Sequence, residues 1–136
     1  MFPKLKAIVN TTNPPTHLTT KAVGDAAEDA ALLHLQRAGL RLQKRNYRTP
    51  GRGGGEIDLI MQEADGTTVF VEVRQRATAN HGGAAGSVST VKQRRIIFAA
   101  RFYLMGLRTM PPCRFDVVSV EPSGIEWLRA AFDAPE

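Results

Sequence analysis

The stretch that decides the fold covers residues 56–76 and reads EIDLIMQEADGTTVFVEVRQR. Apolar and polar residues alternate over residues 56–63 and again over residues 67–76. Ala64, Asp65 and Gly66 lie between the two runs. An alternation with a period of two is typical of half-buried strands, and a short loop that contains glycine is typical of a hairpin. The sequence therefore predicts two antiparallel strands joined by a tight turn.

The register of this hairpin follows from its loop, if Gly66 takes the left-handed position of a three-residue turn. The facing pairs on one side are all apolar: Ile57 with Val73, Leu59 with Val71, and Met61 with Val69. The facing pairs on the other side are Asp58 with Glu72, Ile60 with Phe70, and Glu56 with Arg74. A two-residue loop would mix the two sides, so the first register is favoured.

Asp58 and Glu72 become cross-strand neighbours in this register, with Cβ atoms roughly 4.5–5.5 Å apart. Two carboxylates at that distance repel each other, and partial burial by a helix makes their charges more costly. Three arrangements resolve this conflict: a shared proton, cationic partners, or a bound metal ion. Mg²⁺ is often held by one or two carboxylates together with waters and phosphate oxygens. The plain alternative is a structural ion pair with nearby arginines, and Arg74 has its own alternative in a pair with Glu56.

The remaining chain predicts one α/β domain over residues 21–133, after a flexible tail over residues 1–20 in which Pro14 and Pro15 argue against a helix. The expected elements besides the hairpin are a helix over 22–38, strands over 40–48, 114–120 and 125–128, glycine-rich loops over 50–55 and 80–86, and a helix from Ser87 or Ser89 to about 107. Val91, Phe98, Phe102 and Met105 have near-helical spacing, so we expect them to face the sheet.

The composition favours a cytoplasmic protein. The chain has 136 residues, a formal net charge of +5 and one cysteine, Cys113, which excludes an internal disulfide. It has no apolar run of the roughly 20 residues that a membrane span needs. The three histidines are scattered, so a zinc site is not expected. A basic balance is compatible with attraction to nucleic acid, but a solvated basic surface is its more common explanation.

Basic residues gather at two places. Lys92, Arg94 and Arg95 begin the second long helix, where positive charge opposes the helix dipole and suggests an external phosphate. Arg45, Arg48 and Arg52 border the first glycine-rich loop and could also meet a nucleic-acid backbone. The alternative at both places is a solvated charged face.

Several motifs now occur together and in order. They are Glu28 with Ala31, Asn46-Tyr47-Arg48, Gly55-Glu56-Ile57-Asp58-Leu59-Ile60, Phe70-Val71-Glu72-Val73-Arg74-Gln75-Arg76, Lys92-Gln93 and Arg114-Phe115-Asp116-Val117-Val118. With them the sequence resembles the YraN family of uncharacterised bacterial proteins over residues 21–130. That family is similar to the PD-(D/E)xK, restriction-endonuclease-like nucleases, and among them to the archaeal-type Holliday junction resolvases.

The resemblance implies a mixed central β-sheet of about five strands flanked by helices. It also implies hydrolysis of phosphodiester bonds in DNA, branched or damaged DNA included, with Mg²⁺ or Mn²⁺ as cofactor, and it leaves room for a homodimer. Asp58 and Glu72 would be metal ligands, Glu28 an additional helical carboxylate, and Gln93 a supporting residue of the site. The candidate contacts to nucleic acid are Arg48, Arg52, Arg74, Arg76, Lys92 and Arg95.

Arg74 departs from the pattern, because these nucleases generally have lysine at that position. An arginine stabilises phosphate charge, but with a pKa above about 12 it is a poor proton acceptor. The departure keeps an alternative open, a catalytically inactive nuclease fold that binds nucleic acid. A third reading is an interaction protein in which the acids are structural.

Overall fold

The computed structural model describes residues 19–76 and 88–135. Its elements are α2 (Thr20–Arg37), β1 (Arg41–Arg48), β2 (Glu56–Gln62), β3 (Thr68–Gln75), α3 (Thr90–Met105), β4 (Cys113–Glu121) and β5 (Gly124–Phe132). This order matches the prediction from the sequence, with a longer last strand. The predicted glycine-rich loop over 80–86, Ser87 and nearly all of the predicted tail lie outside the described residues. Neither of the two described helices is long and apolar enough to cross a membrane.

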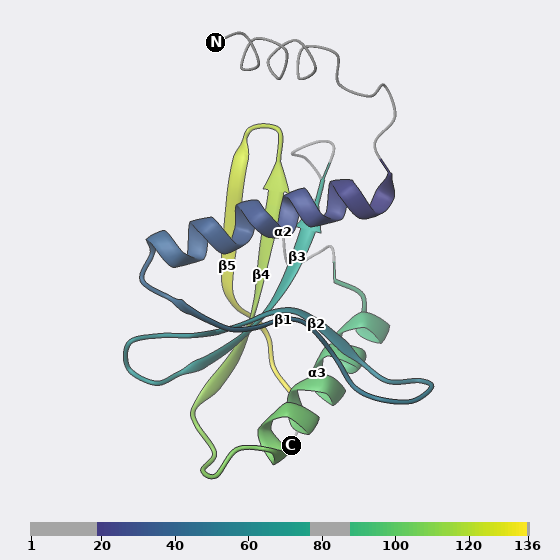
Figure 1. Cartoon of the computed structure of the whole chain (residues 1–136), viewed down its shortest axis with the longest axis vertical. Coiled ribbons are helices and arrows are strands. Elements are labelled where there is room, and N and C mark those ends of the chain that lie inside the picture. The colour runs from purple at the N-terminus through teal and green to yellow at the C-terminus, as the bar shows by residue number, and fades with distance from the viewer. Residues whose placement is uncertain (1–18, 77–87, 136) are drawn as a thin grey trace, which may run out of the picture.

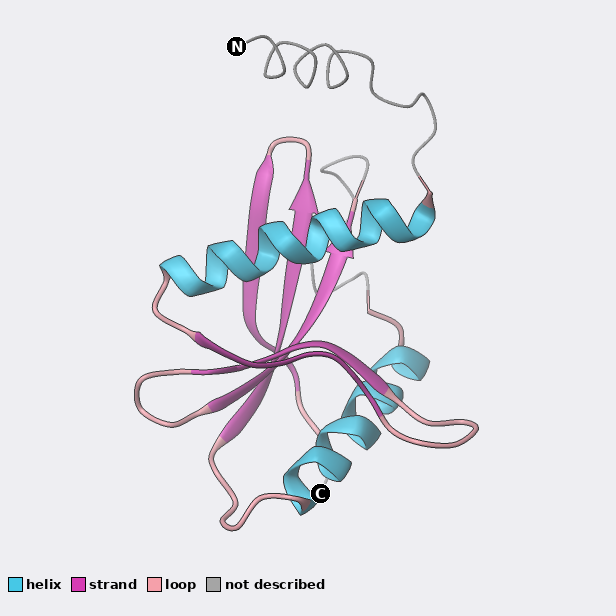
Figure 2. Cartoon of the chain, in the orientation of Figure 1, coloured by secondary structure: helices cyan, strands magenta, loops and turns pink. Residues whose placement is uncertain are grey.

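The five strands form one sheet in the order β1-β2-β3-β4-β5. The pairs β1–β2, β2–β3 and β4–β5 are antiparallel, and β3–β4 is parallel. Helix α3 belongs to the connection between the parallel strands, as such connections usually require. The sheet is therefore mixed and the domain is α/β, which confirms the predicted fold class. Figure 1 shows α2 crossing β3, β4 and β5, and Figure 2 shows α3 (cyan) on the side of the loop that joins β1 to β2.

Helix α2 covers one face of the sheet. The Thr19 hydroxyl caps the helix by accepting a hydrogen bond from the Ala22 amide at 3.0 Å. Gly39, with φ +100°, lies just after its end. The buried residues of this layer are Ala31, Leu35, Leu40, Leu59, Met61, Val69, Val71 and Val118. Their burial fixes the helix over the centre of the sheet, because alternate residues of β2, β3 and β4 supply the matching face.

Helix α3 covers the other face, and here one prediction is wrong. Val91, Phe98, Phe102 and Met105 are 41–80% exposed and do not face the sheet. The helix buries Ile96, Ile97, Ala99 and Ala100 instead. Two alanines let the backbone of α3 approach the sheet and the loop beside it closely, whereas phenylalanines at those positions would hold it away. The helical spacing was correct, but a neighbouring stripe of the same helix is the buried one.

The central hairpin has the predicted register as far as its ladder extends. Leu59 pairs with Val71, Ile60 with Phe70, and Met61 with Val69. The ladder ends at Leu59, and the next residue, Asp58, turns its carboxylate to the β3 backbone. Ile57 then packs in the α3 layer with Ile60 and Phe70, so its predicted place on the face of Leu59 and Met61 is wrong. The alternation breaks because the two strands separate at Asp58.

Candidate functional site

Asp58 lies where β2 and β3 separate. Its Oδ2 accepts a hydrogen bond from the Val73 amide at 2.8 Å, so the side chain takes over a bond that a strand ladder would otherwise make. Burial, and then the neighbouring Glu72 carboxylate, raise the pKa of Asp58 to about 7, while the Val73 amide and the charge of Lys92 oppose the shift. The two acids predicted to be neighbours are therefore close enough for Glu72 to act on the pKa of Asp58.

Glu72 is the more deeply buried acid, with 3% of its side chain exposed. Two cations approach its Oε2 atom: Lys92 Nζ at 3.0 Å and Arg74 Nη1 at 3.7 Å. Neither contact has hydrogen-bond geometry, and Oε2 has no hydrogen-bond donor among the described residues. A buried carboxylate oxygen with charge compensation but no directed donor has a free lone pair that a cation or a water can use.

Arg74 and Glu56 do not form the pair that was the alternative role for Arg74. Arg74 lies beside Glu72, and Glu56 pairs with Arg48 of β1 at 3.3 Å. The separation of the strands at Asp58 explains the difference, because Glu56 then lies closer to β1 than to β3. Arg74 is thus part of the Asp58–Glu72 cluster.

Lys92 comes to this cluster from the first turn of α3. The helix begins at Thr90 and is capped by the Ser89 hydroxyl, which accepts a hydrogen bond from the Lys92 amide at 3.1 Å. The structure therefore confirms Ser89, one of the two capping residues that the sequence predicts. The cap sets the direction of the first turn, and the ammonium group of Lys92 then reaches Glu72. The sequence singled out Lys92 for phosphate but gave no sign of this contact.

Asp58 and Lys92 line a cleft of about 690 Å³ together with Glu28. The other residues along it are Thr20, Lys21, Gly24, Asp25, Asn46, Arg48 and Glu56. Burial, and then the charge of Asp58, raise the pKa of Glu28, although Arg45 Nε lies 3.4 Å from Glu28 Oε1 and opposes the shift. The cleft therefore brings the predicted site residues Glu28, Asp58 and Lys92 to one place, and Lys92 also contacts Glu72.

Two residues of this region have contacts that the sequence did not predict, although Arg45 was named as a possible contact to nucleic acid. Asn46 lines the cleft with a positive φ of 54°, a conformation that asparagine tolerates better than most residues. Arg45 pairs with Glu28 and also with Asp29, at 2.7 Å. The only signal for Asn46 in the sequence is its place in a shared motif, and nothing in the spacing indicates that Arg45 would meet the acids of α2.

The donor set fits a hard divalent cation. Asp58 and Glu72 provide carboxylate oxygens, and Glu72 Oε2 is buried without a hydrogen-bond donor among the described residues. Within residues 19–76 and 88–135, no three histidine, cysteine, aspartate or glutamate side chains converge on a single metal-sized point. A site of two protein carboxylates matches Mg²⁺, which commonly keeps waters or phosphate oxygens as its other ligands. Glu28, being tied to Arg45, stands beside this pair rather than within it.

The other predicted residues divide into two groups. Gln93 Nε2 donates to the Val88 carbonyl oxygen at 3.1 Å, which anchors the segment before α3 and does not bring the amide into the cleft. The Arg76 amide donates to the Val120 carbonyl oxygen at 2.9 Å, at the end of the β3–β4 ladder. Arg52 is exposed in the first glycine-rich loop, and Arg48 and Arg95 line a second pocket beside that loop.

Comparison with known sequences identifies the relatives of this chain. The model of the uncharacterised protein family UPF0102 matches residues 27–120. A UPF0102 protein of Albidiferax ferrireducens is 74% identical over 116 residues, which are 85% of this chain and 91% of the relative. UPF0102 proteins of Polaromonas naphthalenivorans and Paracidovorax citrulli are 63% and 64% identical, over 88% and 85% of this chain and 84% and 86% of the relatives. The chain therefore belongs to the uncharacterised protein family UPF0102, the YraN family that its motifs resemble.

Proposed function

We propose that this protein is a metal-dependent endonuclease that hydrolyses phosphodiester bonds in DNA, with Mg²⁺ or Mn²⁺ as its cofactor. The observation that carries the proposal is the adjacent pair of half-buried Asp58 and buried Glu72, of which Asp58 lines a cleft together with Lys92. Two adjacent acids in a buried place are unfavourable by themselves, and a divalent cation would remove their repulsion. Because the two carboxylates are costly to keep together without a bound divalent ion, we expect the pair to have a function.

Asp58 and Glu72 would hold the metal ion. A divalent ion held there would supply Lewis-acid activation of a phosphate group and of water. The hydrogen bond from the Val73 amide fixes the orientation of the Asp58 carboxylate, which leaves its second oxygen for the ion. Because the pKa of Asp58 is raised to about 7, metal binding near neutral pH would also displace a proton from this carboxyl.

The cations around the acids would act on the phosphate. Hydrolysis forms a bond from water oxygen to phosphorus and breaks the bond from phosphorus to the leaving oxygen, which takes up a proton. Negative charge grows on the phosphate oxygens during this step, and Lys92 and Arg74 lie where they can stabilise it. Glu28, whose pKa is raised by burial, lines the same cleft and would accept a hydrogen bond from the attacking water.

The test is cleavage of a panel of labelled DNAs by the full-length chain. The panel contains duplex, single-stranded, branched and base-damaged substrates, each with Mg²⁺, with Mn²⁺ and with a chelator. We expect metal-dependent cleavage that Asp58→Asn and Glu72→Gln abolish. Asp65→Asn, which changes an exposed acid in the β2–β3 turn, is the matched control and should cleave normally. Equal cleavage by all four proteins would identify a contaminant and reject the proposal.

The second candidate is a nuclease fold that binds nucleic acid without cutting it. Arg74 favours it, because an arginine beside the acids cannot take up a proton as a lysine can. This candidate predicts DNA binding that weakens steeply with salt and does not change with chelator, together with no cleavage of any substrate.

A DNA substrate would agree with the cytoplasmic location that the composition predicts, and this location stays a prediction. A homodimer stays a prediction, and the exposed apolar side chains on α3 give it a candidate surface. Its test is the mass of the full-length chain in solution, measured by light scattering.

A further inference from the structure

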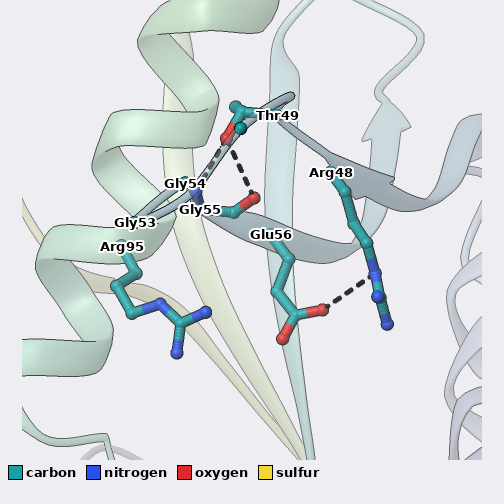
Figure 3. Close-up of a pocket in the computed structure, with 8 residues that line it drawn as sticks. Arg48, Thr49, Gly53, Gly54, Gly55, Glu56 and Arg95 are labelled. Carbon is teal, nitrogen blue, oxygen red and sulfur yellow. Dashed lines mark hydrogen bonds and ion pairs between the residues drawn. The ribbon is translucent and has the colours of Figure 1, made fainter.

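A second pocket, of about 340 Å³, lies beside the first glycine-rich loop. Figure 3 shows the side chain of Glu56 between those of Arg48 and Arg95, which come from β1 and α3, with Thr49 and the glycines above them. Arg48 and Glu56 also line the carboxylate cleft, so the two hollows are neighbours along the surface. A linear polymer bound in the cleft could therefore extend into this pocket.

The loop is held against α3 by contacts that require glycine. The Thr49 hydroxyl, which is buried, accepts a hydrogen bond from the Gly55 amide at 2.8 Å. A Cβ atom on Gly55 would lie 1.9 Å from the Arg95 carbonyl oxygen, and one on Gly54 would lie 2.2 Å from Thr49 Oγ1. The absence of these side chains lets the loop touch the first turns of α3. The pocket is thus built by the close approach of two segments that are far apart in the sequence.

The charge of the pocket is positive and partly uncompensated. Arg48 is paired with Glu56, but Arg95 has no carboxylate partner in the part of the chain that the structure describes. The loop adds exposed Arg52, and the amides of Gly51 and Gly53 donate no hydrogen bond to any described residue. Both of these glycines have positive φ, which directs backbone groups in ways that other residues rarely allow. A free guanidinium and free loop amides are the donors that bind phosphate.

We propose that this pocket binds a backbone phosphate that flanks the one at Asp58 and Glu72, on the same nucleic-acid strand. Arg95 makes the main contact, and Arg48 joins it where the pocket meets the cleft. Glu56 keeps Arg48 in place and lowers the net charge, so the pocket takes one phosphate rather than a cluster of anions. The inference rests on the proposed function, since it takes the carboxylate cleft as the place where a strand is bound.

The test measures binding and requires no cleavage. The full-length Asp58→Asn protein is titrated, in chelator, against a labelled DNA strand that binds it, and against versions in which one phosphate at a time is a neutral methylphosphonate. The titrations are repeated with Arg95→Gln added. Arg94→Gln is the matched control, because Arg94 is an exposed cation on the same helix turn that does not line the pocket.

In the Asp58→Asn protein, we expect a methylphosphonate at one particular position to weaken binding about tenfold. The same position should stand out when Arg94→Gln is added. It should weaken binding no more than the other positions do when Arg95→Gln is added. Arg95→Gln should also lower the slope of log affinity against log salt by about one. Identical profiles for the Arg94 and Arg95 variants, or a profile with no special position, would overturn the proposal. An Arg95-dependent position without any cleavage would support the pocket while the nuclease proposal fails, and cleavage without such a position would do the reverse.

Discussion

Lys92 Nζ lies 3.0 Å from Glu72 Oε2, although Lys92 is in the first turn of α3 and Glu72 lies inside β3. The contact puts an ammonium group next to the predicted metal ligands, where the sequence has Arg74 in place of the usual lysine. Unlike a guanidinium, an ammonium can transfer a proton when its surroundings lower its pKa. The helix thus brings to the cluster the kind of cation that β3 lacks.

If the protein is a nuclease, Lys92→Met should lower kcat/KM for cleavage by at least about a hundredfold, because a positioned charge or proton donor is lost. Arg74→Lys should change it much less, since a cation remains beside Glu72. The measurement is initial cleavage rate against substrate concentration. Lys44→Met, on the exposed side of β1, is the control. Full activity of Lys92→Met would show that the ammonium has no part in the reaction.

Stability provides a second measure of the same contact. Without Lys92 the buried Glu72 charge keeps only the longer contact with Arg74 among its cationic partners. Because Lys92 is partly exposed and solvent screens its charge, the free energy of unfolding should fall by only about 1–2 kcal/mol. Combining Lys92→Met with Glu72→Gln should recover much of the loss. If the two changes are simply additive in urea denaturation, the residues are not energetically coupled.

Asp58 predicts a specific dependence of stability on pH. Its pKa is about 7 in the folded chain against an ordinary value of 3.8, so the folded state binds the proton more tightly. The free energy of unfolding should therefore fall as pH rises from about 4 to about 7. Asp58→Asn removes this penalty and keeps an oxygen for the Val73 amide. In chelator, it should raise the Tm at about pH 8 and have little effect near pH 4.

Asp65→Asn is the control for that experiment, because Asp65 is exposed and its pKa is lowered, first by the Thr67 amide. Its effect on Tm should be small at both pH values. A gain in Tm for Asp58→Asn that is the same at both would show that the carboxyl charge is not responsible. Addition of Mg²⁺ should stabilise the unsubstituted chain more than Asp58→Asn, if the ion binds there.

The sequence predicted those parts of the fold that depend on local patterns. Alternation and a glycine turn are properties of neighbouring residues, so the pairs Leu59–Val71 and Met61–Val69 could be placed in advance. The same pairing brought Asp58 and Glu72 together. The end of the β2–β3 pairing at Asp58, which moves Ile57 to the α3 layer, could not be predicted from the alternation. It arises because the Asp58 carboxylate accepts the hydrogen bond of the Val73 amide in place of a backbone carbonyl.

The parts that were missed depend on how distant segments approach each other. The apolar stripe of Phe98 and Phe102 looks more hydrophobic than the one with Ala99 and Ala100, but only the small residues allow α3 to lie close to its neighbours. The contact of Lys92 with Glu72 depends on the path of the chain between β3 and α3, and spacing in the sequence does not describe that path.

Asp116 is fully buried on β4 and accepts hydrogen bonds from three donors, two of which, Trp127 and Ala130, lie on β5. Its carboxylate accepts hydrogen bonds from Arg114 Nε at 3.0 Å, Trp127 Nε1 at 2.9 Å and the Ala130 amide at 2.9 Å. Asp116→Ala would leave these donors unsatisfied and Arg114 without one of its charge partners. We expect the free energy of unfolding to fall by about 3–5 kcal/mol in urea denaturation.

Glu126→Ala is the matched control for Asp116, since it removes an exposed acid from the same pair of strands. It should change the free energy of unfolding by less than about 0.5 kcal/mol. Asp116→Asn should fall between the two, because the amide can accept some of the hydrogen bonds but carries no charge for Arg114. An Asp116→Ala protein as stable as the control would mean that water replaces the carboxylate.

Two glycines should respond to alanine in opposite directions. Gly24 is inside α2, and a Cβ atom added there would have no neighbouring atom within 4 Å, so Gly24→Ala should raise the free energy of unfolding by about 0.5–1 kcal/mol. A Cβ on Gly55 would meet the Arg95 carbonyl oxygen at 1.9 Å, and a backbone atom cannot turn aside as a side chain can. Gly55→Ala should therefore lower stability by about 2 kcal/mol or more in urea denaturation. If it does not, the loop can leave α3 without cost, and the pocket between Arg48 and Arg95 is not a fixed feature of the fold.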